Sequence, residues 1–308
     1  MGRIVVLGIF VADLAFEAPR LPVMGETLLG QGFRMGPGGK GSNQAVAAGR
    51  AGGEVSLLTR VGRDAFGEIA RGVWGGANVS TDAVIEDEAR PTGAAFIFVS
   101  TTDGNNAIIV EPGASGALSP DDVEAARGLI EGASVFVTQL EQPVAAAHRA
   151  LEIAKAAGVT TVLNPAPAAR LPAGMLALCD YVTPNESEAE ALTGLAVTSV
   201  DEARTAGERL IADGAGAAIL TLGARGALLC QGGEATLVPA FPVDEVRDTT
   251  GAGDAFNGAF ATALGEGRAP VEAVRFACAA ASLSVTRAGA AAAMAERREI
   301  DAMLAGAP

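Results

Sequence analysis

Short apolar runs rich in β-branched residues alternate along the chain with longer stretches of mixed polarity. The apolar runs are Ile4–Ile9, Val55–Val61, Val135–Leu140, Val159–Leu163, Tyr181–Thr183 and Ala217–Leu222. The longer stretches are Asp64–Trp74, Pro120–Glu131, Pro143–Ala157, Glu186–Thr193 and Val200–Asp213, followed near the C-terminus by Ala255–Leu264, Val271–Val285 and Glu296–Leu304. Strands that are apolar throughout suit a parallel sheet covered on both faces. The alternation therefore predicts a doubly wound α/β fold, with a mostly parallel sheet flanked by helices.

Two segments, approximately residues 14–35 and 90–112, break this alternation. They contain short β-rich runs with no helix between them: Thr27–Phe33, Ala95–Ser100 and Asn106–Val110. The turn-forming residues Thr102–Asn105 predict a hairpin between the last two runs. The residues alone leave two interpretations open, a separate small β-sheet that covers a site and extra edge strands of the main sheet.

The chain is acidic, with 36 Asp and Glu against 22 Lys and Arg and a formal net charge of −14. Proteins that bind nucleic acid or anionic membranes present a basic face, so this balance argues against both kinds of partner. It also sets a condition on any anionic substrate. Local cations, a metal ion or a helix N-terminus must reverse the field of the protein at the site.

Histidine and cysteine are scarce, which narrows the chemistry further. A single histidine, His148, removes most mechanisms based on Ser-His-Asp or Cys-His groups, and His148 itself is assigned no role. Cys179, Cys230 and Cys278 are widely spaced and odd in number, which favours a reducing cytoplasm over a disulfide framework. No apolar stretch reaches the roughly 18 residues of a membrane span, and Ile4–Ile9 is interpreted as a buried strand rather than part of a signal peptide.

The strongest chemical signal is the segment Asp248–Phe256 (DTTGAGDAF), where glycines precede a helix of small residues. Free N–H groups at such a helix start, together with the helix dipole, form a site for phosphate or for charge that develops in a transition state. Asp254 in the first turn is placed to take a proton from a hydroxyl that attacks a phosphoryl group. The alternative is an acidic residue that only stabilises the start of a helix.

A second glycine-rich segment, Gly36–Gln44 (GPGGKGSNQ), precedes the predicted helix Ala45–Ala51. Its GxGxxG pattern does not lie in the first strand–helix turn, where a dinucleotide fingerprint belongs, and the spacing around Lys40 is not that of a Walker loop. We interpret it as a loop that brings a cation and two amides close to a hydroxylated ligand. A tight turn followed by close helix packing is the alternative.

Polar residues follow two later strands. Asn185 and Glu188, in the segment Thr183–Glu188, share one face of a helix, where an amide and a carboxylate can orient water around Mg²⁺ and phosphate oxygens. The same residues also suit an ordinary helix cap. Thr221–Gly226 (TLGARG) either lines a nucleotide with its backbone or forms a hairpin turn before Ala227–Cys230.

Taken in chain order, these segments resemble the ribokinase/phosphofructokinase-B family of sugar kinases. The matching segments are Gly38–Ala48 (GGKGSNQAVAA), Gln139–Glu141 (QLE), Leu163–Ala166 (LNPA), Thr183–Glu188 (TPNESE), Asp248–Asp254 (DTTGAGD) and Val285–Arg287 (VTR). The resemblance implies one ribokinase-like kinase domain over residues 1–308, with the small β-sheet as a lid. It further implies transfer of the γ-phosphoryl group of ATP to a sugar hydroxymethyl group, with Mg²⁺ and a monovalent cation (K⁺), in a cytoplasmic homodimer that pairs through its lid strands.

The resemblance also implies roles for individual residues. Asp254 is the general base, and the backbone amides of Gly251, Ala252 and Gly253 form the anion hole. The sugar-binding positions are Asp13, Gly39, Lys40, Asn43 and Glu141, together with Asp254. The nucleotide-binding positions are Asn185, Thr221, Gly223, Ala224, Gly226, Gly253 and Cys278. Glu188 holds Mg²⁺ through water, and the loop for the monovalent cation contains Asp248, Thr250, Ser284, Arg287 and Gly289.

Three positions depart from the family pattern. Val11 replaces an asparagine two residues before the first sugar-binding aspartate, Ala293 replaces a serine at the end of the cation loop, and Cys278 stands where a polar or aromatic side chain flanks the adenine. The leading acceptor is O5 of D-ribose, and Val11 keeps 2-deoxyribose, another sugar or a nucleoside as alternatives. A sugar-binding protein without catalytic activity and a nicotinamide-dependent oxidoreductase are the hypotheses from other classes.

Overall fold

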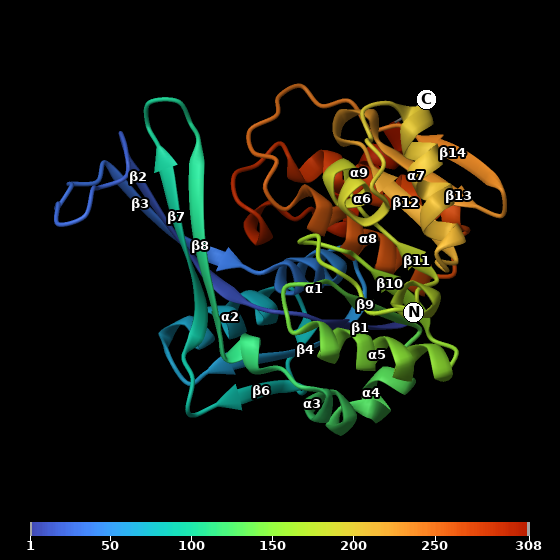
Figure 1. Ribbon diagram of the computed structural model, residues 1–308, viewed down its shortest axis with the longest axis horizontal. Helices are drawn as coiled ribbons and strands as arrows, with labels where there is room; N and C mark the ends of the chain where they lie inside the picture. The colour runs from blue at the N-terminus through green and yellow to red at the C-terminus, as the bar shows by residue number, and fades with distance from the viewer. Residues whose placement is uncertain (1, 307–308) are drawn as a thin grey trace.

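Two β-sheets of different size organise the chain, and the computed structural model describes residues 2–306 (Figure 1). The large sheet has the strand order β14-β13-β12-β11-β10-β9-β1-β4-β5, and β6 also pairs with β4. Its pairings are parallel except those that β13 makes with β12 and β14. The prediction of a mostly parallel sheet is confirmed.

The bounds of the elements agree with the predicted runs to within a few residues at most positions. The strands of the large sheet are β1 (Arg3–Leu7), β4 (Glu54–Gly62), β5 (Val79–Ser80), β6 (Val84–Asp87), β9 (Val135–Thr138), β10 (Thr160–Leu163), β11 (Tyr181–Val182), β12 (Ala217–Thr221), β13 (Ala227–Gln231) and β14 (Glu234–Val238). The helices are α1 (Lys40–Arg50), α2 (Ala65–Gly76), α3 (Pro120–Ala125), α4 (Arg127–Glu131), α5 (Val144–Ala156), α6 (Glu186–Thr193), α7 (Val200–Ala212), α8 (Ala252–Gly265), α9 (Pro270–Ser284) and α10 (Arg297–Gly306). Short 3₁₀ turns lie at Ala114–Ala117, Met175–Leu178, Gly223–Arg225 and Ala291–Ala293.

Helices cover both faces of the large sheet, as a doubly wound fold requires. Successive side chains of a strand point to opposite faces, and β1 shows this directly. Ile4 and Val6 belong to a core shared with α1, α2, α8, α9 and α10, whereas Val5 and Leu7 belong to a core shared with α3 to α7. The two apolar layers bury Ile4 to Leu7 of β1 and fix the carboxyl ends of the parallel strands at one edge of the sheet.

The small sheet is separate from the large one and has the order β3-β2-β7-β8. Its strands are β2 (Val11–Ala18), β3 (Gly32–Gly38), β7 (Thr92–Ser100) and β8 (Asn106–Gly113), with β2 and β7 parallel at its centre. In Figure 1 it stands away from the main body at the left. The interpretation as edge strands of the main sheet is therefore wrong, and the predicted β7–β8 hairpin is confirmed.

Four local predictions need correction. The strand expected at Thr27–Phe33 begins only at Gly32, and it includes Gly36–Gly38, which were expected in a loop. Helix α1 begins at Lys40 rather than at Ala45. The helix expected at Pro120–Glu131 is two short helices that meet at Ala126. Backbone pairing with β2 explains the first two differences, because Gly36 to Gly38 pair with Asp13 to Val11. No helix within residues 2–306 is long and apolar enough to cross a membrane.

Candidate active site

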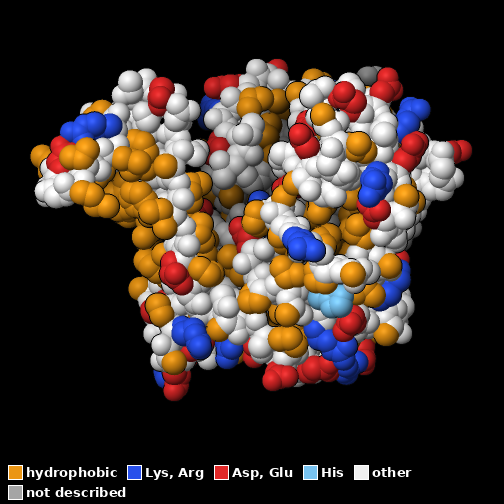
Figure 2. All heavy atoms as spheres, viewed as in Figure 1, with side chains coloured by type: hydrophobic (Ala, Val, Ile, Leu, Met, Phe, Trp, Pro, Cys, Tyr) orange, Lys and Arg blue, Asp and Glu red, His pale blue; other side chains and the backbone are white. Residues whose placement is uncertain are grey.

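A cavity of about 210 Å³ lies where β10, β11 and β12 end and α8 begins. Its lining residues are Lys40, Asn164, Ala166, Thr183, Asn185, Glu188, Thr221, Thr249, Gly251, Ala252, Gly253, Asp254 and Asn257. Open α/β sheets bind ligands at the carboxyl ends of their strands. Figure 2 shows the surface hollowed between the small sheet and the C-terminal part of the chain. The fold thus brings three predicted groups of residues, from α1, α6 and α8, to one cavity.

The start of α8 has the backbone geometry of an anion site. Gly251 adopts φ 76°, and a Cβ there would lie 2.9 Å from Cβ of Ala290, so a side chain is excluded on both grounds. The N–H of Ala252 donates to the carbonyl of Thr249 at 3.2 Å. Within residues 2–306 the N–H groups of Gly251 and Gly253 have no backbone acceptor, so both are available to a ligand in the cavity.

Asp254 is buried, and both of its carboxylate oxygens accept hydrogen bonds from side-chain amides of α1. Asn43 Nδ2 donates to Oδ2 and Gln44 Nε2 donates to Oδ1, each at 3.0 Å. Burial raises the pKa of Asp254, while Lys40 and the two amides act in the opposite direction. A carboxylate with a raised pKa beside free N–H donors has the properties of a general base for phosphoryl transfer.

On the other side of Asp254, residues of the small sheet and α1 meet. Glu141 Oε2 accepts the N–H of Lys40 at 2.7 Å, and burial raises the pKa of Glu141. Burial also raises the pKa of Asp13 to about 6. Gly38 makes room for this carboxyl group, because a Cβ at Gly38 would lie 2.2 Å from Asp13 Oδ1. Gly39 has φ 88°, and its Cβ would lie 2.5 Å from the carbonyl oxygen of Ile9.

Val11 lies on the same face of β2 as Asp13, two residues away. It is only 4% exposed and belongs to an apolar cluster with Ile9, Ala95 and partly buried Ile97. Gly93 and Ala95 of β7 pair with Val11 and Asp13, so the apolar cluster continues directly into the position of the buried carboxyl group.

At the opposite side of the cavity, Asn185 and Glu188 form a reciprocal cap on α6. Asn185 Oδ1 accepts the N–H of Glu188 at 2.8 Å, and Glu188 Oε2 accepts the N–H of Asn185 at 2.9 Å. The predicted helix cap is therefore present. Both residues also line the cavity. An isolated bridge to Thr221 joins this cap to the end of β12.

Other predicted nucleotide positions lie beyond the cavity. Gly223 and Gly226 have φ 55° and 98° in the turn of the β12–β13 hairpin, so the predicted hairpin is present, and the prediction that this turn also lines a nucleotide stays a prediction. Ala224 lies in the same turn. Cys278 is buried in α9 with its thiol near the carbonyl of Val238, and burial raises its pKa to about 12. A neutral thiol packed in this way adds no charge to the region.

The predicted cation loop consists of two segments that Asp248 holds together. Its Oδ1 accepts the N–H of Thr250 at 2.9 Å and its Oδ2 accepts the N–H of Gly289 at 2.8 Å. The carbonyl of Ser284 accepts the N–H of Arg287 at 3.2 Å, and the Arg287 guanidinium pairs with Glu299. The side chain of Arg287 is thus engaged elsewhere, which leaves its backbone carbonyl as the group available to a cation.

Comparison with known proteins identifies the family. The model of the pfkB family of carbohydrate kinases matches residues 1–297. The chain belongs to this family. Ribokinase of Haemophilus influenzae is 39% identical over 294 residues, 96% of this chain and 95% of that protein. Deoxyribokinase of Salmonella typhi is 39% identical over 262 residues, 84% of each protein. The structure of Arabidopsis thaliana ribokinase complexed with ribose and ATP superimposes with a TM-score of 0.93 at 32% identity, covering 99% of each chain.

Membership of the pfkB family confirms the predicted resemblance, the ribokinase fold and the assignment as a sugar kinase. It excludes the nicotinamide oxidoreductase and gives the non-catalytic alternative no support. Sequence reasoning assigned no role to several residues of this pfkB kinase that the structure brings to the site: Gln44, Gln139, Asn164, Thr183, Thr249 and Asn257. Five of them, all except Asn257, lie in segments already quoted for the family resemblance, but a sequence match does not show which side chains are in contact.

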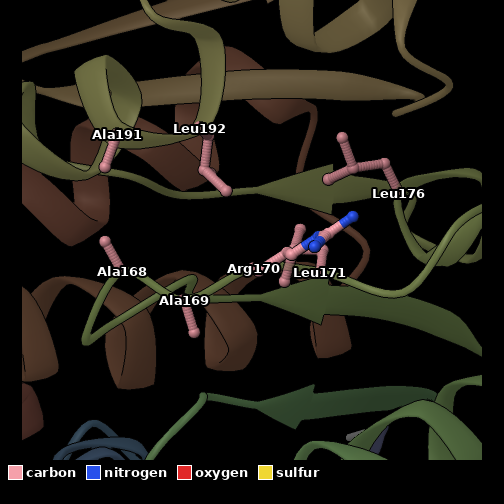
Figure 3. Close-up of a pocket in the computed structure, with 7 residues that line it drawn as sticks. All are labelled: Ala168, Ala169, Arg170, Leu171, Leu176, Ala191 and Leu192. Atoms are coloured by element: carbon pink, nitrogen blue, oxygen red, sulfur yellow. The ribbon is translucent and has the colours of Figure 1, made fainter.

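A larger hollow of about 480 Å³ lies elsewhere on the pfkB kinase, between the loop after β10 and the C-terminal half of α6 (Figure 3). It is lined by Ala168, Ala169, Arg170, Leu171, Leu176, Ala191 and Leu192. No predicted site residue lines it, and Arg170 is its one charged side chain. Several predicted site residues line the smaller cavity instead.

Proposed function

We propose that this carbohydrate kinase transfers the γ-phosphoryl group of ATP to the O5 hydroxymethyl group of D-ribose, giving ribose 5-phosphate. One observation carries the proposal: the buried carboxylate of Asp254 shares a cavity with Lys40 and with the glycine start of α8. A proton acceptor, a cation and free N–H donors are therefore in one place. The ribokinase relatives, one of them solved with ribose and ATP, support ribose and ATP as the substrates.

Asp254 acts as the general base in this proposal. The O5–H bond of the sugar breaks as O5 attacks the γ-phosphorus, and the proton passes to a carboxylate oxygen of Asp254. The bond between the γ-phosphorus and the bridging oxygen breaks, and ADP leaves. The amides of Gly251, Ala252 and Gly253 stabilise the negative charge on the transferred group, although the amide of Ala252 is shared with Thr249.

The sugar lies between α1 and the inner face of the small sheet. Its hydroxyl groups donate to the carboxylates of Asp13 and Glu141 and contact the polar groups of α1 near Lys40. The partly buried carboxyls support this placement, because burial of an acidic group is costly unless a ligand or another partner compensates it. Sugar-binding residues in this proposal are Asp13, Gly39, Lys40, Asn43 and Glu141.

ATP lies along the other side of the cavity, on residues Asn185, Thr221, Gly223, Ala224, Gly226, Gly253 and Cys278. Residues 2–306 hold no cluster of three or more His, Cys, Asp or Glu that would bind a metal directly. This fits Mg²⁺, which keeps most of its waters and binds through substrate phosphates and one or two carboxylates. Glu188 is the proposed carboxylate, because its side chain lines the cavity. Oε2 accepts the N–H of Asn185, which leaves Oε1 for a water molecule bound to the ion. Bound Mg²⁺ neutralises phosphate charge during transfer.

We further propose a K⁺ ion at the loop that contains Asp248, Thr250, Ser284, Arg287 and Gly289. The donor set consists of a carboxylate and backbone carbonyls, which are oxygen ligands of the kind that such cations prefer. Asp248 already joins the two segments through Thr250 and Gly289. Ala293 offers no side-chain oxygen, so the site relies on backbone carbonyls. The cation would fix the loop that leads into Gly251.

The small sheet is the proposed lid and dimer interface of a single kinase domain. Its outer face exposes Phe16, Phe33, Met35, Phe96 and Ile109, and Phe16 packs against both other phenylalanines with ring centroids 4.9 and 5.7 Å apart. Figure 2 shows apolar side chains gathered over this sheet. A contiguous apolar face of this kind suits a second copy of the same sheet. The three buried free cysteines fit a cytoplasmic location.

A second acceptor, 2-deoxyribose, is favoured by Val11. An isopropyl group in an apolar cluster cannot bond a sugar hydroxyl, and an unpaired buried hydroxyl costs about 1–3 kcal/mol. A sugar without that hydroxyl avoids the penalty. The deoxyribokinase relative, 39% identical over 84% of the chain, supports this candidate.

Competition between the two sugars tests both proposals. Parent enzyme, Val11→Asn and the control Val11→Thr are assayed for kcat/KM on D-ribose and 2-deoxyribose with ATP. We expect Val11→Asn to shift the ratio toward ribose by up to about tenfold, and Val11→Thr to shift it less. An unchanged ratio would mean that Val11 does not face the acceptor. Absence of ATP consumption with either sugar would contradict the proposed function itself.

A further inference from the structure

Behind Asp254 lies a buried set of side-chain amides centred on Gln44, which is fully buried. Gln44 Nε2 donates to Asp254 Oδ1 and to Asn164 Oδ1, each at 3.0 Å, and its Oε1 accepts from Gln139 Nε2 at 2.7 Å. Both amide hydrogens and the carbonyl oxygen are therefore engaged. Reversing the amide would direct Oε1 at two acceptor oxygens, so the hydrogen bonds fix which end faces Asp254.

The neighbouring amide, Asn43, is held quite differently. It donates from Nδ2 to Asp254 Oδ2, but its Oδ1 is buried without a hydrogen-bond partner. Asn43 therefore keeps hydrogen-bonding capacity for a ligand, whereas Gln44 has none left. Of the two donors to Asp254, only Gln44 is oriented by groups that do not depend on the sugar.

Helix packing keeps Gln44 at this position. A Cβ at Gly258 of α8 would lie 2.4 Å from the backbone oxygen of Gln44 and 2.6 Å from Cβ of Ala47. Thr262 Oγ1 donates to the carbonyl of Ala48 at 3.1 Å one turn further along. The two helices thus touch through their backbones, and the short distance lets the Gln44 side chain reach the first turn of α8.

We propose that Gln44 is a positioning residue for phosphoryl transfer. Its amide is fixed by Asn164 and Gln139 and holds Oδ1 of Asp254, so that the remaining lone pairs of the carboxylate face the cavity. The same hydrogen bond stabilises the charged form of the base. The proposal rests on the proposed role of Asp254. Gln44 would touch neither the sugar nor the nucleotide, so its effect would be confined to the orientation and proton affinity of the base.

The charged groups that act on Asp254 are Lys40, Glu141 and Glu188. Lys40 lowers its pKa, and each of the two glutamates interacts unfavourably with its negative charge. A donor hydrogen bond to a carboxylate lowers its pKa. Removal of the Gln44 donor therefore raises the pKa of Asp254, and the fraction of enzyme with an ionised base falls at the acid end of the pH range.

The test compares Gln44→Met with the matched control Gln142→Met. Gln142 is also a buried glutamine, but it donates to Thr138 and to the carbonyl of Gln139 and does not contact Asp254. At saturating sugar and ATP, the acid limb of the kcat profile reports the base in the ternary complex. We expect this limb to move up by about 1–2 pH units in Gln44→Met, with KM for the sugar changed less than about threefold and partial recovery of kcat at high pH. Gln142→Met keeps the parental limb.

Asp254→Asn, assayed in parallel, separates the proposed role of Asp254 as the base from the proposed role of Gln44. If Asp254→Asn keeps parental turnover, the proposed base is wrong. If Asp254→Asn is inactive while Gln44→Met folds and keeps the parental acid limb, the inference about Gln44 alone is overturned. Should Gln44→Met not fold, Gln139→Met removes the group that orients Gln44 and is expected to shift the limb in the same direction by a smaller amount. No shift in that variant would also overturn the inference.

Discussion

Asp254→Asn separates the chemical role of this side chain from its structural role, because asparagine keeps the shape of the carboxylate. The new amide places an NH₂ group where Asp254 accepted a hydrogen bond. Asn43 can turn to meet it, since its Oδ1 has no partner and would become the acceptor. Gln44 cannot turn, so the carbonyl of the new asparagine faces Gln44. All hydrogen bonds around residue 254 are therefore restored in the variant.

The expected magnitude follows from these contacts. Loss of a general base lowers kcat by about 10²–10⁴-fold, which is about 2.7–5.5 kcal/mol of transition-state stabilisation. Burial raises the pKa of Asp254, so a neutral amide at this position removes an unfavourable desolvation of charge. We expect the thermal midpoint of the variant to equal or exceed that of the parent, and ATP binding to persist.

The assay couples ADP release to NADH oxidation, with D-ribose or 2-deoxyribose as acceptor, and is accompanied by thermal unfolding. Asp180→Asn is the matched control, since this carboxylate bonds Lys155 and Thr161 at the amino end of β10, away from the cavity. A kcat within tenfold of the parent for Asp254→Asn, with normal unfolding, would refute the assignment of the base. Inactivity accompanied by a large fall in the thermal midpoint would refute the argument about restored hydrogen bonds.

Three further predictions follow from the same site. Burial raises the pKa of Asp13 from 3.8 to about 6, and its carboxylate form accepts sugar hydroxyls more strongly than its protonated form, so kcat/KM for the sugar should fall as the pH drops below about 6; Asp13→Asn should show a weaker dependence, because ionisation of Asp254 still contributes to it. If the proposed dimer forms through the small sheet, Ile109→Lys, at a residue 70% exposed on its outer face, should give a monomer in sedimentation, whereas Val271→Lys on α9 should not. Exchange of K⁺ for tetramethylammonium at constant ionic strength should lower kcat, and Asp248→Asn should weaken the response, because Asp248 holds the two loop segments together.

The parallel sheet was predictable because its strands are apolar on both faces, as the two cores around β1 illustrate. The small sheet was harder to predict from the sequence. Gly36, Pro37 and Gly38 suggested a loop, yet they form a strand because they pair with β2, and Gly38 also leaves room for the Asp13 side chain. A local pattern cannot report such a contact, since it depends on a partner strand some 25 residues earlier. Similarly, Thr27–Phe33 had the composition of a strand but found no neighbour to pair with before Gly32.

In the candidate site, too, some residues could be predicted from local sequence patterns and others depend on tertiary contacts. Asp254 and the glycines before it could be singled out from chemistry, because a carboxylate beside a glycine-rich helix start suits a base next to an anion site, although the sequence left open that it only stabilises the helix. Gln44 could not, since an amide next to Asn43 in a helix gives no sign of which residues it bonds. Its partners Gln139 and Asn164 directly follow β9 and β10, and Asp254 lies in α8, which packs closely against α1 at Gly258.

The acidity of the chain explains why the site is built mainly from backbone donors. With a net charge of −14, the field of the protein opposes a nucleotide triphosphate, and the cavity itself holds Glu188 and Asp254 against the single cation Lys40. Added phosphate charge would raise the pKa values of these two carboxyls further. Helix-start N–H groups and Mg²⁺ attract phosphate without adding a side chain that would compete for Asp254 as a proton partner. The amide of Gln44 then favours the ionised form of the base. A second cation would have the same effect, but it would form an ion pair with the carboxylate that must accept the proton.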